Sequence, residues 1–241
     1  QIDTIDEPHR AIAGDYDALF RDLLAAEDVV IETFDGREPT LPAPAECHGW
    51  IVPGSRRSVD DHVDWIPRLS EWVTEAAGSG VPLVGVCFGH QLIARVLGAP
   101  VERVGWRVGA VDYRVHRLPP GVAGATAAPA SFRVLASHQD QVVALPDGAT
   151  LLASAPDCPV AGFSVGDRIL CLQGHPEFVP ELVASLYASR VPTLGRPTVE
   201  AALATLGRPL DRALVASWIA DTLCAPAAPS TGPAAPNLQG R

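Results

Sequence analysis

Short apolar strands that alternate with amphipathic helices are the feature that most restricts how this chain can fold. Residues 49–52 and 82–86 are apolar runs of strand length, and residues 29–34 form a β-branched run. Residues 63–77 and 89–97 repeat apolar side chains at helical spacing. Strands that alternate with helices of about 10–15 residues are typical of α/β folds with a parallel sheet.

The second half of the sequence has a different pattern. Several runs alternate apolar and polar side chains as strands do: 109–117, 133–135, 149–153, 160–165 and 169–173. Gly166-Asp167, between the last two runs, is typical of a hairpin turn. Helical spacing returns in three segments: 180–189, 198–206 and 211–223. We therefore expect a mostly parallel α/β sheet with an antiparallel extension, followed by closing helices.

The length and composition fit one domain with a tail. The chain has 241 residues, of which 47% are hydrophobic, so it can bury a normal core. Residues 1–224 are predicted to form this domain. Residues 225–241 are rich in Ala and Pro without periodicity, and we expect them to be a disordered tail. Met is absent even at position 1, so we expect Gln1-Ile2 to be the end of a first strand whose beginning is missing.

Charge and cysteine usage exclude several classes of protein. The formal net charge of −10 disfavours binding to nucleic acid and to anionic membranes, and no apolar run reaches membrane-spanning length. The five cysteines are widely spaced without a CxxC pair, which excludes a zinc ribbon and a dense disulfide framework. The histidines show no metal-ligand spacing, so we expect no metal and no cofactor. A reducing, cytoplasmic location is the simplest interpretation.

The segment Gly85-Val86-Cys87-Phe88-Gly89-His90-Gln91 follows a buried strand and opens a helix. Its pattern is a nucleophile elbow with Cys87 as nucleophile, because glycines on both sides permit the sharp turn. The helix N-terminus favours a thiolate, and the Phe88 N–H can donate to a developing oxyanion. A small buried cysteine at an ordinary strand–helix junction is the alternative interpretation.

His175 is the best candidate for the base that such a thiol requires. It follows the strand at 169–173, and residues two apart in an extended segment share a face, so Glu177 can orient its imidazole. Pro176 limits rearrangement between them. A strand-end histidine beside a surface glutamate is the competing interpretation, which the Cys87 elbow makes less attractive.

Together, the elbow and Gly174-His175-Pro176-Glu177 resemble the class I glutamine amidotransferase family, with the resemblance covering roughly residues 45–190. It implies a flavodoxin-like open sheet with helices on both faces. It also implies that Cys87 is the nucleophile, His175 the general base and acid, and Glu177 the orienting residue. Small stand-alone members are the nearest type.

Further segments are similar to the family pattern. Pro53-Gly54-Ser55 matches the oxyanion-loop position, so Gly54 and Ser55 would join Phe88 there, although the usual form is Gly-Gly-Pro. Ser137-His138-Gln139-Asp140 resembles the Ser-His segment that holds the amino-acid end of glutamine, and Gln91 would contact the same substrate. A polar turn at a strand end is the other interpretation of residues 137–140.

The resemblance implies hydrolysis of the glutamine side-chain amide to glutamate and ammonia through a cysteine thioester. No phosphate-binding motif is present and little chain follows residue 190, so we expect the protein either to hydrolyse its substrate alone or to pass the ammonia to a separate synthase. A stand-alone γ-glutamyl amide or peptide hydrolase is the main alternative. A cysteine-type α/β-hydrolase and an inactive regulatory module rank below these two.

Overall fold

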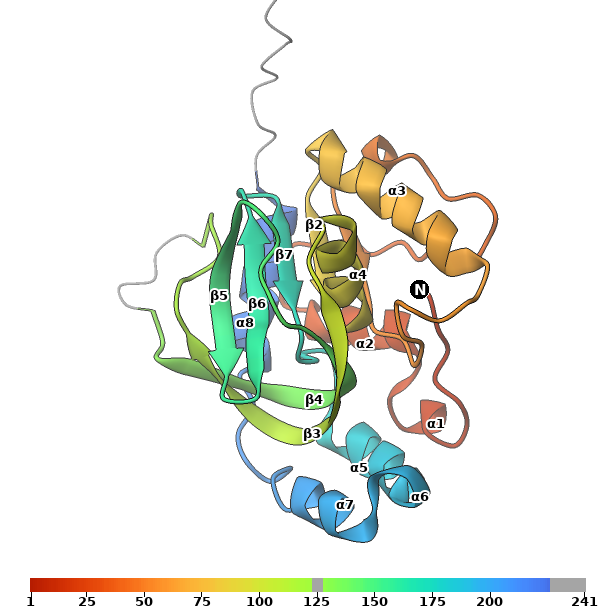
Figure 1. Ribbon diagram of the computed structural model, residues 1–241, viewed down its shortest axis with the longest axis vertical. Helices are drawn as coiled ribbons and strands as arrows, with labels where there is room; N and C mark the ends of the chain where they lie inside the picture. Colours follow the sequence, from red (N-terminus) through yellow and green to blue (C-terminus); the bar gives the residue numbers. More distant parts are fainter. Residues whose placement is uncertain (123–127, 226–241) are drawn as a thin grey trace, which may run out of the picture.

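The strands form one mixed sheet in a computed structural model that describes residues 1–122 and 128–225 (Figure 1). Its order is β1-β2-β7-β6-β5-β3-β4. The strands are β1 (Trp50–Val52), β2 (Leu83–Val86), β3 (Val101–Val115), β4 (Ser131–Val142), β5 (Ala149–Ala155), β6 (Cys158–Val165) and β7 (Ile169–Leu172). Strands β1, β2 and β7 are parallel neighbours, and the remaining pairs are antiparallel.

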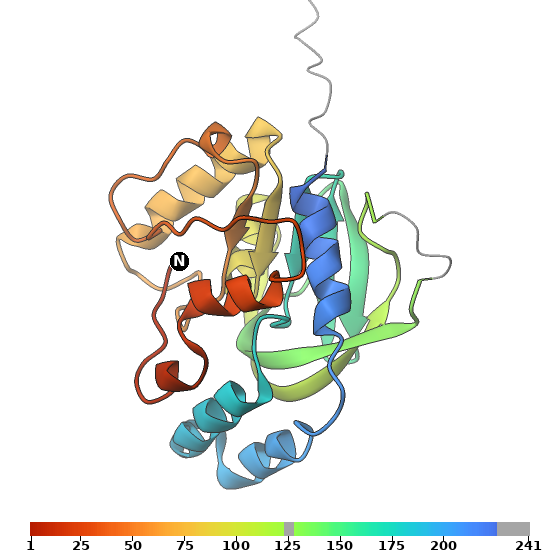
Figure 2. The ribbon, with the colours of Figure 1, turned by 180° about the vertical axis from the view of Figure 1, so that it is seen from behind.

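Helices cover both faces of the parallel part of the sheet (Figures 1 and 2). Helices α3 (Trp65–Ser79) and α4 (Phe88–Val96) pack on one face, and α2 (Tyr16–Leu23) and α8 (Arg212–Leu223) lie on the other. Side chains of β2 alternate accordingly, because Leu83 joins the core under α3 and α4 while Val84 joins the core under α8. The predicted fold class is confirmed, with the parallel pairing concentrated in β1, β2 and β7.

A second group of helices packs against the long strands β3 and β4. It consists of α5 (Pro180–Ser189), α6 (Val191–Leu194) and α7 (Arg196–Leu203), at the bottom of Figure 1. Their shared core includes Leu182, Tyr187 and Val199 together with Ala110 and Leu135 of the sheet. The short helices α1 (Arg10–Ala13) and η1 (Pro44–Glu46) complete the helices of the described residues.

Most predicted elements are present, but two predicted strand segments are not. Residues 29–34 and Gln1-Ile2 were expected in strands, but neither segment belongs to the sheet. They touch each other, because the Gln1 amino group donates to Phe34 O over 2.6 Å and Gly36 N donates to Gln1 O over 2.8 Å. Without a neighbouring strand they make no ladder of backbone hydrogen bonds. Of the predicted tail, residues 226–241 lie outside the described residues.

Two close backbone approaches position helix α4 on the sheet. A Cβ at Gly89 would lie 1.9 Å from Val52 O, and a Cβ at Gly85 would lie 2.7 Å from the backbone of Gly89. The Gly89 N–H also donates to Pro53 O over 3.1 Å. Glycine is therefore required at both positions by space, and α4 starts in direct contact with β1 and β2.

We predict that Gly89→Ala destabilises the fold by about 3 kcal/mol or more, because its methyl group would overlap backbone atoms that cannot move aside. Gly78→Ala is the matched control, since no atom lies within 4 Å of a Cβ at Gly78 in α3 and alanine favours helix by about 0.5–1 kcal/mol. Urea unfolding measures both free energies. Equal stability of the two variants would contradict the packing argument.

Candidate active site

Cys87 occupies the turn between β2 and α4 in a strained backbone conformation. Its φ is 53° and its ψ is −102°, and it is the only non-glycine residue with positive φ among the described residues. Strain of this kind is costly and concentrates at functional sites. The turn places Cys87 just beyond the carboxyl end of β2, where its N–H donates to Leu172 O of β7 over 2.9 Å.

The parallel pairing of β2 with β7 brings His175 to the same edge of the sheet. Val86 is in register with Leu172, so the residues that follow both strands emerge side by side. The His175 N–H donates to Leu135 O of β4 over 2.7 Å, which fixes its backbone. The side chains of Cys87 and His175 are hydrogen-bonded to each other. The fold thus joins a thiol and an imidazole that are far apart in the sequence.

Glu177 holds the other side of the His175 ring. His175 Nδ1 lies 2.7 Å from Glu177 Oε1, and the two side chains are 3% and 0% exposed. The ring of Phe178 stacks on the imidazole with centroids 4.0 Å apart and planes at 2°. The hydrogen bond and the stacked ring fix the orientation of the imidazole, which leaves Nε2 for the thiol.

Charges around His175 favour its protonated form. Burial lowers the pKa of His175, but the charges of Glu177 and Cys87 and the hydrogen bonds to both outweigh it and raise the pKa to about 10. The contacts of the ring therefore favour its imidazolium form at neutral pH. This arrangement can supply a nucleophile and a proton donor to one substrate.

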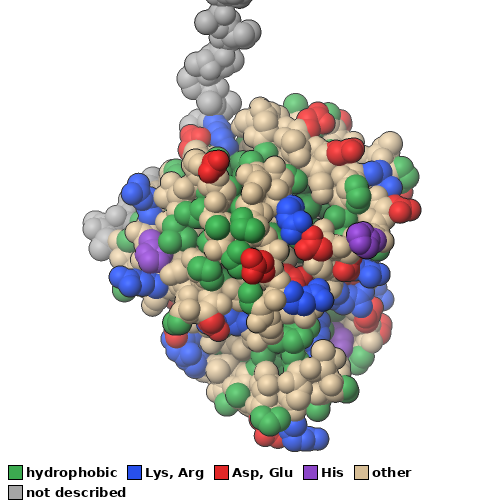
Figure 3. Space-filling view, in the orientation of Figure 1, with side chains coloured by type: hydrophobic (Ala, Val, Ile, Leu, Met, Phe, Trp, Pro, Cys, Tyr) green, Lys and Arg blue, Asp and Glu red, His purple; other side chains and the backbone are tan. Residues whose placement is uncertain are grey.

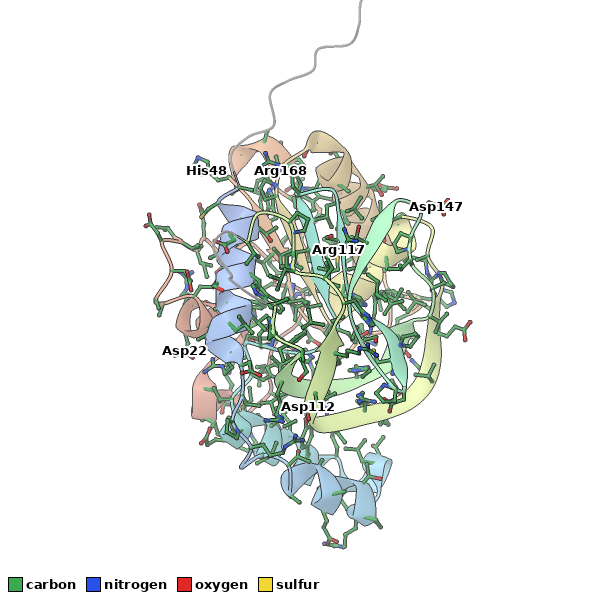
Figure 4. All side chains as sticks on the ribbon, turned by 90° about the vertical axis from the view of Figure 1, so that its left-hand side faces the viewer. Asp22, His48, Asp112, Arg117, Asp147 and Arg168 are labelled. Atoms are coloured by element: carbon green, nitrogen blue, oxygen red, sulfur yellow. The ribbon has the colours of Figure 1, made fainter. Side chains whose placement is uncertain are left out.

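Arg212 at the start of α8 supports the segment that carries His175 and Glu177. Its guanidinium donates to Pro176 O over 2.9 Å and pairs with Asp22 of α2 over 2.8 Å. Asp22 is labelled beside α8 in Figure 4. These contacts connect the segment that carries His175 to α2 and α8, which lie on the same face of the sheet.

The predicted oxyanion residues lie around the thiol. Phe88 is the first residue of α4, where backbone N–H groups have no partner inside the helix. A Cβ at Gly54 would lie 2.8 Å from His175 Cε1, so this loop contacts the imidazole directly. The Ser55 hydroxyl lies 3.2 Å from Asp3 Oδ2, so its side chain is engaged outside the oxyanion position. Their oxyanion roles remain predictions.

The predicted substrate-binding residues line the same cavity as Cys87 and His175. Residues 137–140 lie inside strand β4, so the interpretation as a turn at a strand end is wrong. His138 is buried, and burial, followed by the charges of His175 and Arg107, lowers its pKa to about 3. The amide nitrogen of Gln91 donates to Asp140 O over 2.7 Å and to Gln173 Oε1 over 3.2 Å. Their contacts to a substrate remain predictions.

The cavity has a volume of about 360 Å³, which is within the usual range for small-molecule sites. Sequence reasoning missed several of its walls: Tyr16, Trp106, Phe178 and Arg190. Phe178 directly follows the His175 motif and could have been found from that position. Trp106 and Arg190 carry no motif, and only the packing of β3 and α5 brings them to the site.

Residues 1–122 and 128–225 contain no group of three His, Cys, Asp or Glu side chains arranged to hold a metal ion. Within the same residues, every helix is too short or too polar to cross a bilayer. On the face in Figure 3, basic and acidic side chains are interspersed.

Comparison with known proteins gives consistent matches. The family model described as glutamine amidotransferase class-I matches residues 21–189. Gamma-glutamyl peptidase 3 of Arabidopsis thaliana is 34% identical over 160 residues, or 64% of each chain, so the match spans less than two thirds of that relative. The GMP synthase of Leifsonia xyli is 34% identical over 62% of this chain, but this covers only 29% of the synthase.

Solved structures agree on the fold. A glutamine amido transferase from Methylobacillus flagellatus has a TM-score of 0.68 with 22% identity, covering 85% of this chain and 86% of its own. A glutamine amidotransferase from Thermotoga maritima has a TM-score of 0.67 with 20% identity, covering 85% of this chain and 89% of its own. At these identities the likeness establishes the architecture alone.

We predict that Glu177→Gln lowers the pKa of His175 from about 10, because the neutral amide removes the charge that contributes most to raising it. NMR titration of histidine-labelled protein measures the shift, with the exposed His62→Gln as the control. The folded pKa lies above the value of about 6.5 for an unfolded histidine. The stabilisation is therefore complete below about pH 6.5 and lost as pH rises towards 10.

The melting temperature should show the same linkage. We expect the wild-type protein to lose stability between pH 6.5 and 10 more steeply than Glu177→Gln, whose His175 gains less from protonation on folding. Parallel curves for the two proteins would contradict the role of Glu177 in holding the imidazolium.

Proposed function

Because the chain belongs to the glutamine amidotransferase class-I family, we propose that it hydrolyses the side-chain amide of glutamine through a covalent intermediate on Cys87. The observation that carries this proposal is the hydrogen-bonded series Cys87–His175–Glu177, in which Cys87 and His175 line one cavity and the buried Glu177 holds the other side of the imidazole. The Cys87 elbow adds a strained turn and a helix N-terminus at the thiol.

In the first step the Cys87 thiolate attacks the amide carbonyl carbon, and the carbonyl oxygen becomes an oxyanion. The backbone N–H of Phe88 and the loop at Gly54 and Ser55 would donate to this oxygen; loss of one such donor typically costs about 10²–10³ in rate. The intermediate collapses when the C–N bond breaks and His175 gives its proton to the leaving nitrogen. The products of this step are ammonia and a γ-glutamyl thioester.

In the second step His175, now neutral, accepts a proton from water as the water attacks the thioester carbonyl. The C–S bond breaks, glutamate leaves, and Cys87 returns as a thiolate beside protonated His175. Glu177 stabilises the imidazolium in both steps and keeps the ring in one orientation. No cofactor is required for either step.

A γ-glutamyl peptide or amide is the second candidate substrate. The support is that two relatives of Arabidopsis thaliana, 34% and 32% identical, are named gamma-glutamyl peptidases. The same chemistry applies, with an amine or a peptide amino group leaving instead of ammonia. For glutamine, the ammonia would serve a separate synthase, as the match to GMP synthases suggests.

We predict that Cys87→Ala reduces hydrolysis of the preferred amide by at least about 10³-fold while the melting temperature changes little. Glu177→Gln should cause a smaller loss, because the base remains present. Cys158→Ala is the matched control, since this buried thiol lies outside the cavity lining. Turnover retained by purified Cys87→Ala would refute the mechanism.

The two candidate substrates are separated by assaying the isolated chain with glutamine and with γ-glutamyl dipeptides, measuring released glutamate. A glutamine amidotransferase that works with a synthase should hydrolyse glutamine in preference to the dipeptides. A preference for the dipeptides by 10-fold or more in kcat/KM, which corresponds to about 1.4 kcal/mol, would favour the peptidase function.

A further inference from the structure

Tyr16 is the first residue of α2, and its side chain lines the cavity that contains Cys87. Its ring centroid lies 6.3 Å from that of Phe178, whose ring stacks on the imidazole of His175. A Cβ at Gly54 would lie 3.6 Å from Tyr16 Cε1 and 2.8 Å from His175 Cε1. Tyr16 therefore packs next to both the imidazole and the loop predicted to bind the oxyanion.

The position of Tyr16 is fixed by its backbone and by its ring. The Asp15 carboxylate caps α2 by accepting from the Tyr16 N–H over 2.9 Å, and it also accepts from the Ile5 N–H over 3.0 Å. The ring packs in one apolar cluster with Leu19 and Phe178, and the residue is only 7% exposed. The phenol thus has a defined place in the wall of the cavity.

The chain has three tyrosines, and their hydroxyl groups differ in their surroundings. The Tyr187 hydroxyl donates to Ala136 O and accepts from the Gly109 N–H. The Tyr113 hydroxyl is fully buried without a partner, and Tyr113 lies outside the cavity lining. Among residues 1–122 and 128–225 the Tyr16 hydroxyl has no hydrogen-bond partner either, but it is not sealed from solvent as that of Tyr113 is. Of the three phenols, that of Tyr16 is therefore the one available to a molecule in the cavity.

The Tyr16 hydroxyl is a proton donor directed towards the reacting groups. Burial raises the pKa of Tyr16 well above its ordinary value, and the charges of Asp3, Glu177 and Cys87 raise it further, so the phenol keeps its proton at neutral pH. The ring also borders a second cavity beside residues 28–34. The charges that act on the hydroxyl nevertheless place this end of the side chain towards Cys87.

The predicted oxyanion loop has few donors of its own. Pro53 has no N–H, and the Arg56 N–H donates to Asp3 Oδ2 over 2.7 Å. The Ser55 hydroxyl is engaged with the same carboxylate over 3.2 Å. The backbone N–H groups of Gly54 and Ser55 remain, so an oxyanion beside Cys87 would gain from a donor on a side chain.

We propose that the Tyr16 hydroxyl donates a hydrogen bond to the carbonyl oxygen of the amide that Cys87 attacks. This inference rests on the proposed function. When the C–S bond forms, an electron pair of the C=O bond moves to the oxygen, so the hydrogen bond strengthens in the transition state. An amide nitrogen is a donor and a carbonyl oxygen an acceptor, so a protonated phenol matches the oxygen. Tyr16 is thus a catalytic residue outside the motifs that carry Cys87 and His175.

The test is Tyr16→Phe, which removes the hydroxyl and keeps the ring. The melting temperature should change little, because the hydroxyl has no partner in the protein. We expect kcat to fall by about 10–100-fold with little change in KM, as for loss of a hydrogen bond to a developing charge. Released glutamate is measured with glutamine, γ-glutamylmethylamide and γ-glutamylglycine. The fold loss should be equal on each amide that wild type hydrolyses, because these amides share the carbonyl oxygen and differ in the leaving group.

Tyr113→Phe is the matched control, because it removes an unpartnered hydroxyl that lies outside the cavity lining. Its kcat should equal that of wild type. Alkylation of Cys87 by iodoacetamide, followed by mass spectrometry, is the second control. In this reaction the sulfur displaces iodide without forming an oxyanion, so the rate should be the same in wild type and both variants.

Three results would overturn the assignment. Tyr16→Phe could keep the kcat of wild type, which would show that the hydroxyl takes no part. Its loss could be confined to the amides with a larger leaving group, which would place the contact there instead. Its alkylation by iodoacetamide could slow as much as its turnover, which would indicate an effect on the thiol or the fold. Wild-type protein that hydrolyses none of the three amides would instead refute the proposed function itself.

Discussion

The parallel pairing of β2 with β7 is the interaction on which the site depends. Both strands end at the same edge of the sheet, with Val86 and Leu172 in register, so Cys87 and the segment leading to His175 leave side by side. A shift of the register by one residue would turn the side chains of β7 to the opposite faces. In the observed register, Leu170 and Leu172 contribute to the core on the α8 face while Cys171 contributes to the core under α4.

The sequence contains enough information to predict the motif residues and most of the sheet. Glycines at 85 and 89 mark the elbow because a Cβ at either position would meet backbone, and the two-residue spacing of His175 and Glu177 predicts their 2.7 Å contact. The strand expected at residues 29–34 is absent, because composition indicates an extended backbone but cannot supply the neighbour with which it would pair. Local patterns therefore predict local conformation, and pairing depends on the whole chain.

Residues that reach the cavity only through tertiary packing could not be found in the same way. Arg190 lies at an ordinary helix end, and Trp106 lies outside the alternating run at 109–117, so the sequence gives neither position a feature that marks a site residue. Their meeting depends on Tyr187, whose hydroxyl bridges β3 and β4 and sets where α5 ends. The residues that we assign to bond formation and proton transfer lie in motifs, whereas Arg190 and Trp106, which complete the wall of the cavity, lie outside them.

The buried cysteines differ in their surroundings, and the sequence alone does not show the difference. Some are buried only among other side chains, whereas Cys87 is buried next to an imidazole. Burial raises the pKa of Cys158 to about 12 and also raises the pKa of Cys171, so both thiols remain protonated and act as small apolar side chains. Cys87 is buried as well, but it is hydrogen-bonded to an imidazole whose charge Glu177 supports. The neighbouring imidazole, rather than exposure, distinguishes the candidate nucleophile from the two other buried thiols. A cysteine that served only to fill the strand–helix junction would need neither the strained backbone nor the paired imidazole.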